Sequence, residues 1–197
     1  MVAGAISIFL LIATAIQVIA LYQVVVWKRE RRNLPKPRKT IKVSILKPMR
    51  GIEPNLETNL HSFFNLNNTV PFELLICIKN PDDPAIAVVQ KLMDLHPQVD
   101  VKLYIATPDM GFNPKVSNIH TAWKNTESDL LLISDSNVRV EPDYLEMLLA
   151  ERETGAGLVT QAMYCTDAAN IGAHLDAVQA NTFYLKATAF LSFFNVA

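Results

Sequence analysis

The sequence predicts an α/β domain with a mainly parallel sheet, preceded by one membrane-spanning helix. Three observations lead to this fold class. Residues 2–27 carry no charged side chain. Between residues 41 and 165, short apolar runs alternate with segments of helical spacing, and such alternation favours a parallel sheet with helices on both faces. Polar residues gather where the predicted strands end, which is where open α/β sheets bind ligands.

Composition narrows the classes of protein. The chain has 197 residues, which is enough for one domain of about 150 residues and an appendage. Half of the residues are apolar, and the formal net charge is −1. No basic patch with interleaved aromatic residues is present, so we expect no nucleic-acid partner. Cys77, Cys165 and the four histidines show no spacing typical of a zinc site.

The apolar segment 2–27 is long enough, as a helix, to cross a hydrocarbon core of about 30 Å. Lys28, Arg29, Arg31 and Arg32 follow it directly, so the positive-inside rule predicts a cytoplasmic domain after the helix. A cleaved signal peptide is less favoured, because the run is long and no positive region precedes it. We expect residues 1–27 to be a membrane anchor and residues 28–40 a basic, extended linker.

The expected elements after the linker alternate between strand and helix. We predict strands at 41–46, 72–78, 99–105, 130–133 and 158–164, the first ended by Lys47-Pro48 and the fourth a buried, central one. We predict helices opened by Glu53-Pro54-Asn55 (to about residue 66), by Pro84 (85–95), by Asn113-Pro114 and by Glu141-Pro142-Asp143 (to about residue 151). The α/β domain is expected to span residues 41–165.

Lysines and acids follow the first predicted strands. Lys47, at the end of the first, either faces a phosphate or lies in solvent. Of Asp82 and Asp83, after the second, one is expected to cap the next helix, and the other can accept hydrogen bonds from a base or ribose. Lys115 and Asn118 share a helix face at i, i+3, which suits phosphate contact or an exposed helix end equally.

Asp135-Ser136-Asn137 follows the fourth predicted strand. A carboxylate at this place can hold a hard divalent cation that bridges to a diphosphate. The alternative is an ordinary Asx turn at the strand's end.

Six short motifs occur in one order: VSILKP (43–48), GIEPNL (51–56), DDPA (82–85), NPKVSN (113–118), DSNVRV (135–140) and GLV (157–159). In these the chain resembles the ceramide glucosyltransferase family, whose bacterial relatives include hopanoid-associated glycosyltransferases. The resemblance implies a membrane-anchored, inverting enzyme with a GT-A fold, which transfers a hexose from a UDP-sugar to a lipid hydroxyl.

The resemblance also implies roles for individual residues. Asp83, with Asp82 beside it, would bind the uridine part of the donor, and Lys47 and Lys115 would lie near the nucleotide. Asp135, with a divalent cation (Mn²⁺ or Mg²⁺), would hold the diphosphate of UDP. Asn137 occupies the third position of the DxD-like triplet, where a neutral amide is a weaker metal ligand than a carboxylate.

Two features that the resemblance implies are missing from the sequence: a third aspartate acting as general base and a Gln/Arg-x-x-Arg-Trp motif. We therefore expect a donor-binding half, with residues 166–197 as the start of an acceptor half, and little transfer by this chain alone. The apolar segment 183–196 either borders a lipid entrance or forms a helix without its packing partners.

Three other functions stay open or are disfavoured. The acceptor could be a polyprenyl phosphate or a polysaccharide, because the same donor half would serve it. The chain could instead be a membrane-tethered module that binds nucleotide without turnover. A phospho-receiver domain is disfavoured, because there the acid pair follows the first strand and not the second.

Overall fold

The computed structural model describes residues 2–30, 36, 41–67, 69–105, 111–153 and 155–194. The chain forms two compact units, one of Pro35–Gly155 and one of Met1–Leu34 with Ala156–Ala197. Most of the predicted linker (31–35 and 37–40) and most of the loop before Asn113 (106–110) lie outside the described residues.

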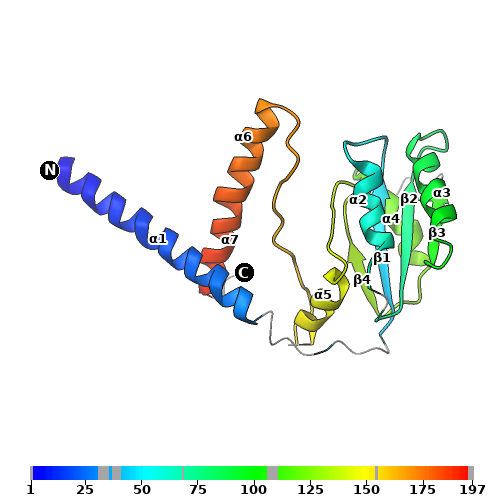
Figure 1. Cartoon of the computed structure of the whole chain (residues 1–197), viewed down its shortest axis with the longest axis horizontal. Helices are drawn as coiled ribbons and strands as arrows, with labels where there is room; N and C mark the ends of the chain where they lie inside the picture. Colours follow the sequence, from blue (N-terminus) through cyan, green and yellow to red (C-terminus); the bar gives the residue numbers. More distant parts are fainter. Residues whose placement is uncertain are drawn as a thin grey trace. The chain divides into compact units, whose positions relative to one another are not determined.

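The unit Pro35–Gly155 is built on a parallel sheet of four strands, β1 (Val43–Met49), β2 (Phe72–Ile78), β3 (Val101–Ile105) and β4 (Leu130–Ile133). Their order across the sheet is β3-β2-β1-β4, and every pairing is parallel. Figure 1 shows the strands running side by side, with a helix between each strand and the next along the chain. The predicted α/β class with a parallel sheet is confirmed.

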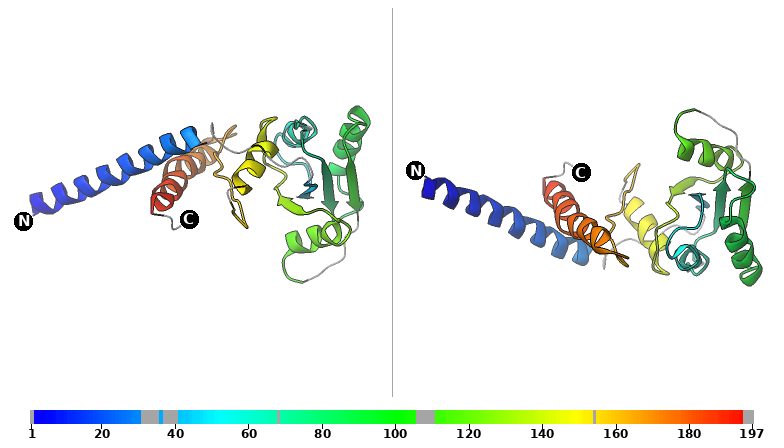
Figure 2. Two further views of the ribbon diagram at one scale, coloured as in Figure 1. Left: turned by 90° about the horizontal axis from the view of Figure 1, so that it is seen from below. Right: turned by 90° about the horizontal axis from the view of Figure 1, so that it is seen from above.

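Helices cover both faces of the sheet. On one face, α2 (Leu56–Phe64), α3 (Ala85–Leu95) and α5 (Tyr144–Arg152) share a core with β1 and β2. On the other, α4 (Pro114–Lys124) packs Ala122 against Leu46, Leu75 and Cys77. The views in Figure 2 show α4 on the opposite side of the sheet from α2 and α3.

Local sequence explains where these helices lie. Leu56, Leu60, Phe63 and Phe64 recur at helical spacing, and all four are buried in α2. At the start of α4, the Asn113 side chain accepts a hydrogen bond from the backbone N–H of Lys115 at 3.0 Å, with Pro114 in the first turn. The predicted helix starts are confirmed, and α2 ends two residues before the predicted Leu66.

The end of the first strand was predicted wrongly. Pro48 does not stop β1, which continues to Met49, so Lys47 lies inside the strand and not at its end. Leu46 O accepts from Ser134 N, and because backbone groups alternate sides along a strand, the nitrogen of Pro48 faces the same neighbour. That neighbour, β4, ends at Ile133 opposite Leu46, so the missing N–H of Pro48 costs no ladder bond.

The fourth strand is parallel, as predicted, but it is neither central nor fully buried. Among the described strands β4 lies at an edge of the sheet. Leu130 and Leu132 pack on the core, whereas Leu131 and Ile133 are 44% and 52% exposed. They face the side of α4, which packs mainly on β1 and β2.

The predicted fifth strand does not form. Residues 158–169 have neither helical nor strand structure, and Leu158 and Tyr164 are exposed. The backbone of Cys165 bonds instead to a side chain: its N–H donates to Asn181 Oδ1 at 2.7 Å, and its carbonyl accepts from Asn181 Nδ2 at 2.9 Å. These bonds satisfy the backbone of the residue that follows the predicted strand.

The other unit is helical, with α1 (Val2–Glu30), α6 (Ile171–Gln179), a π-helical segment η2 (Ala180–Tyr184) and α7 (Leu185–Phe193). In α1, the segment Gly4–Trp27 is long and apolar enough to cross a membrane. Only 6% of its most apolar stretch is buried in the structure. α7 packs on α1, where Lys186 Nζ donates to Gln17 Oε1 at 3.1 Å and the rings of Tyr22 and Phe193 meet edge to face.

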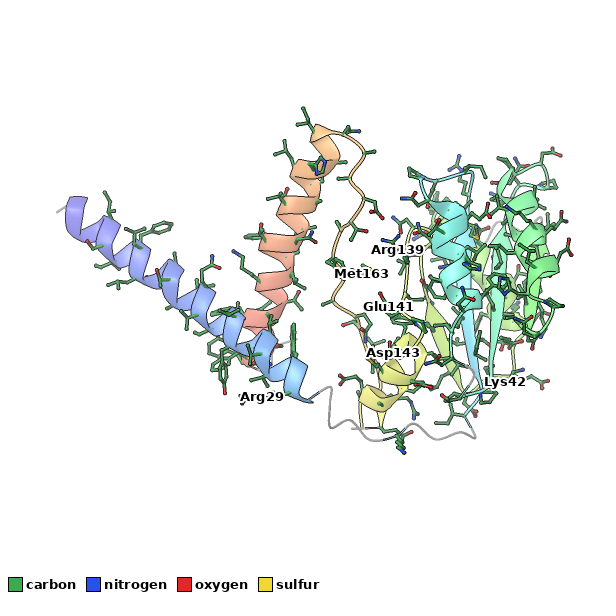
Figure 3. All side chains as sticks on the ribbon, in the orientation of Figure 1. Arg29, Lys42, Arg139, Glu141, Asp143 and Met163 are labelled. Atoms are coloured by element: carbon green, nitrogen blue, oxygen red, sulfur yellow. The ribbon has the colours of Figure 1, made fainter. Side chains whose placement is uncertain are left out.

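A buried carboxylate joins three strands at the amino-terminal end of the sheet, where Figure 3 shows Lys42. Glu73 accepts hydrogen bonds from Ser44 Oγ at 2.5 Å, Thr126 Oγ1 at 2.8 Å and Lys102 Nζ at 2.7 Å. Lys42 Nζ lies 3.6 Å from it. Burial by itself raises the pKa of Glu73, but the bonds from Lys102, Ser44 and Thr126 outweigh it and lower the pKa to about 2.

Replacing this carboxylate should change how stability depends on pH. A carboxylate with a lowered pKa stabilises the fold above its ordinary pKa of 4.5, and this is lost as the pH falls toward 2. We expect Glu73→Gln to lose about 3 kcal/mol of unfolding free energy at pH 7 and to show a flatter profile between pH 5 and pH 2, in urea denaturation of the detergent-solubilised chain.

The matched control is Glu57→Gln, because Glu57 forms an exposed ion pair with Lys91. That change should cost under about 1 kcal/mol. Equal losses in the two variants would contradict the role given to Glu73.

Candidate functional site

Two adjoining pockets lie at the carboxyl ends of β1, β2 and β4, with volumes of about 510 and 290 Å³. Both are lined by Met49, Arg50, Pro114 and Asn118, so they form one hollow with two compartments. The larger compartment is further lined by Lys79, Asn80, Pro81 and Asp83, and the smaller by Pro48, Glu53, Lys115, Asp135, Ser136 and Asn137.

Lys47 is fully buried beneath the hollow and lines neither compartment. Its Nζ donates to the carbonyl of Asp135 at 2.8 Å and to Ser134 Oγ at 3.2 Å, and it lies 3.6 Å from the centre of the Phe63 ring. Burial lowers the pKa of Lys47 to about 7, although the charges of Asp135 and Glu53 raise it. The lysine therefore ties β1 to the loop after β4.

Asp83 is 7% exposed and joins two loops of the hollow. Its carboxylate accepts the N–H of Gly51 at 3.0 and 2.8 Å and the N–H of Ala85 at 2.9 Å. It thus bonds the first turn of α3, as expected of one of the two acids, and also fixes the loop after β1. Asp82, its neighbour, is exposed and lines neither compartment.

Asp135 projects into the smaller compartment from the loop after β4. Its carboxylate, about half exposed, forms an ion pair with Lys115 at the start of α4. Its neighbour Ser136 is buried and donates to Glu53 Oε2 at 2.6 Å. Asn137 lines the same compartment. From here the chain runs past Arg139, Glu141 and Asp143 to α5 (Figure 3).

The shared face predicted for Lys115 and Asn118 is confirmed, since both line the smaller compartment. Asn118 also lines the larger compartment and is 7% exposed. Of the seven predicted site residues, the structure brings Asp83, Lys115, Asn118, Asp135 and Asn137 to the hollow, and it leaves Lys47 beneath it and Asp82 outside it.

Arg50 and Glu53 line the hollow but were not predicted as site residues. The first strand was predicted to end at Lys47-Pro48, whereas β1 ends at Met49. The residues that follow the strand were therefore expected too early in the sequence. In the structure β1 pairs in register with the seven residues of β2 and ends at Met49, and one sequence does not display this pairing. Arg50 is then the first residue beyond the strand.

The smaller compartment offers two side chains that can bind a divalent cation, Asp135 and Asn137. The described residues contain no group of three or more His, Cys, Asp and Glu side chains suited to a metal. Asp135 offers one carboxylate, and Asn137 in the same compartment offers a neutral amide oxygen. Such a sparse set fits Mg²⁺ or Mn²⁺ when phosphate oxygens and water supply the other ligands.

A sequence profile for Glycosyl transferase family 21 matches residues 6–192 of the chain. The chain belongs to this family. The match covers both the helix α1 and the sheet with its hollow, and it confirms the family expected from the six motifs. With it, the assignment to the glycosyltransferases is confirmed.

Known relatives of this family 21 chain are ceramide glucosyltransferases. Ceramide glucosyltransferase 3 of Caenorhabditis elegans is 40% identical over 128 residues, which are 64% of this chain and 28% of that protein. The ceramide glucosyltransferase of Komagataella phaffii (strain GS115) is 36% identical over 115 residues, 56% of this chain and 22% of that one. The chain thus spans about a quarter of the length of these relatives.

Two solved structures are similar at low identity. They are the mannosyltransferase PcManGT from Pyrobaculum calidifontis in complex with GDP-Man and Mn²⁺ (16% identity, 68% of this chain and 43% of that one) and S. aureus TarS 1-349 (19%, 65% and 41%). Both have a TM-score of 0.46. Because both TM-scores are low, the description of the fold rests on the strand order given above.

The adjacent acids Asp82 and Asp83 allow a direct comparison. Asp83→Ala would leave the N–H groups of Gly51 and Ala85 without their acceptor, so we expect a loss of about 1–3 kcal/mol in unfolding free energy. Asp82→Ala changes an exposed side chain and should stay within about 0.5 kcal/mol of wild type. Urea denaturation followed by circular dichroism measures the unfolding free energy of both variants. A loss for Asp83→Ala no larger than that for Asp82→Ala would contradict the role of Asp83 in joining the two loops.

Proposed function

We propose that this chain is the donor-binding part of a membrane-bound glycosyltransferase, which transfers a hexose from a UDP-sugar to a lipid hydroxyl of the ceramide or hopanoid kind. The observation that carries the proposal is the hollow at the carboxyl ends of the strands. In a member of family 21, it gathers Asp83, Asn118, Lys115, Asp135 and Asn137 around one space. Ligands of open α/β sheets bind at this end.

The two compartments suit the two parts of a nucleoside diphosphate. The larger, with Asp83 and Asn118, takes the uridine, because buried polar groups can read a base or a ribose. The smaller, with Lys115 and Asp135, takes the diphosphate. Lys115, which pairs with Asp135 in this structure, can donate to a phosphate when the cation binds the carboxylate.

The reaction would be one displacement at the anomeric carbon with inversion. The acceptor hydroxyl oxygen forms a bond to that carbon and its proton passes to a base, while the bond to the diphosphate breaks and UDP leaves with the electron pair. A divalent cation on Asp135 and Asn137, when bound, would offset the charge that develops on the diphosphate. Lys47 and Ser134 keep the backbone of Asp135 in place for that cation. We assign no residue of this chain as general base.

The helix α1 is the proposed link to the lipid acceptor. Gly4–Trp27 has a mean hydropathy of 2.4, and a lipid substrate is available only at a membrane or from a lipid carrier. Arg29 and the basic residues after it would place the donor domain on the cytoplasmic side.

Calorimetry on the detergent-solubilised chain tests the donor site. We expect UDP to bind in the presence of Mn²⁺ and to bind at least about tenfold more weakly without it. Asp135→Asn should remove this dependence on Mn²⁺, because an amide is a poor ligand for a hard cation. The matched control, Asp94→Asn, changes an exposed residue of α3 and should bind like wild type.

Absence of UDP binding in the folded wild-type chain would contradict the proposed donor site. Metal-dependent binding without transfer to ceramide, polyprenyl phosphate or polysaccharide would instead favour a nucleotide-binding module, and transfer to one of the latter two would replace the proposed acceptor.

A further inference from the structure

Arg50 occupies the junction of the hollow, since it is one of the residues that line both compartments. It is the first residue after β1, and its side chain is exposed. The next residue, Gly51, has a φ of +66°, which an L side chain rarely adopts. The N–H of Gly51 donates to both oxygens of the buried Asp83, so the backbone that presents Arg50 is fixed.

The charges around the hollow favour a further cation beside a diphosphate, in addition to Lys79, Lys115 and the proposed divalent cation. Asp83, Glu53 and Asp135 all line it, and their negative charge opposes a second anion. Lys115 is already paired with Asp135. Within the described part of the chain, no hydrogen bond or ion pair joins Arg50 to another residue, so its guanidinium can serve a ligand.

We propose that Arg50 binds the diphosphate of the donor at the junction of the two compartments. The inference rests on the proposed function and adds a residue to its donor site. A guanidinium presents a planar fork of N–H donors that matches phosphate oxygens, and it stays charged at every physiological pH. Placed between the compartments, it reaches the phosphates of a nucleotide whose uridine fills the larger one.

This placement predicts how much Arg50 contributes to the binding of uridine, UMP and UDP. Uridine carries no phosphate, so the charge of Arg50 contributes less to its binding than to that of UMP or UDP. UMP brings one phosphate to the junction, and UDP brings two. The contribution of Arg50 should therefore grow from uridine to UDP, and it should weaken as salt screens the charges.

The test is the substitution Arg50→Gln, studied by calorimetry with uridine, UMP and UDP in the presence of Mn²⁺. A charge-assisted hydrogen bond lost from a phosphate corresponds to a decrease of roughly tenfold to a hundredfold in UDP affinity. The affinity for uridine should fall by much less than the affinity for UDP, because uridine offers no phosphate to the guanidinium. Arg50→Lys keeps the charge without the fork and should recover part of the UDP affinity.

Arg152→Gln is the matched control, because Arg152 lies in the last turn of α5 and lines neither compartment. It should bind UDP like wild type. Wild-type binding of UDP together with equal binding by Arg50→Gln would overturn the role of Arg50 and leave the donor site standing. An equal loss of uridine and UDP affinity would also overturn it, because Arg50 would then shape the hollow. Failure of wild type to bind UDP would refute the proposed function itself.

Discussion

The buried amino group of Lys47 needs hydrogen-bond acceptors, and it finds them in the loop that carries Asp135. Without the carbonyl of Asp135 and Ser134 Oγ, this amino group would be buried without hydrogen-bond partners, at a cost of about 1–3 kcal/mol. The same bonds hold the loop after β4, whose strand is short and lies at a sheet edge. Core stability and site geometry are thus coupled through one side chain.

Asp83 plays the corresponding part on the other side of the hollow. It is a buried acid whose charge is balanced by backbone N–H groups, and it fixes the loops after β1 and β2 to each other. The two buried side chains, of Lys47 and Asp83, hold the backbone from which the exposed side chains of Arg50 and Asp135 project. Buried side chains thus fix the backbone, and exposed side chains face the hollow. This arrangement favours a preorganised anion site, because little of the main chain must become ordered when a nucleotide binds.

Much of this arrangement could be predicted from the sequence. Apolar spacing located α2, and the acids and prolines at 82–84 marked the start of α3. The positions of Asp83 and Asp135 followed from where strands end, and that of Asn118 from its spacing to Lys115 in one helix. The rest depended on pairing, which one sequence does not display: Pro48 is tolerated because β4 is too short to meet it. Residues 158–164 resemble a strand in composition but have no sheet partner here, and the exposed half of β4 reflects the reach of α4.

Hydrogen–deuterium exchange of the solubilised chain, with and without UDP and Mn²⁺, tests most directly that the hollow is the donor site. The account predicts new protection in four segments, 47–53, 79–85, 113–118 and 134–138, because their residues line or support the two compartments. It predicts unchanged exchange around Glu73, at the opposite end of the sheet. Protection confined to that opposite end, or to α6 and α7, would contradict the account.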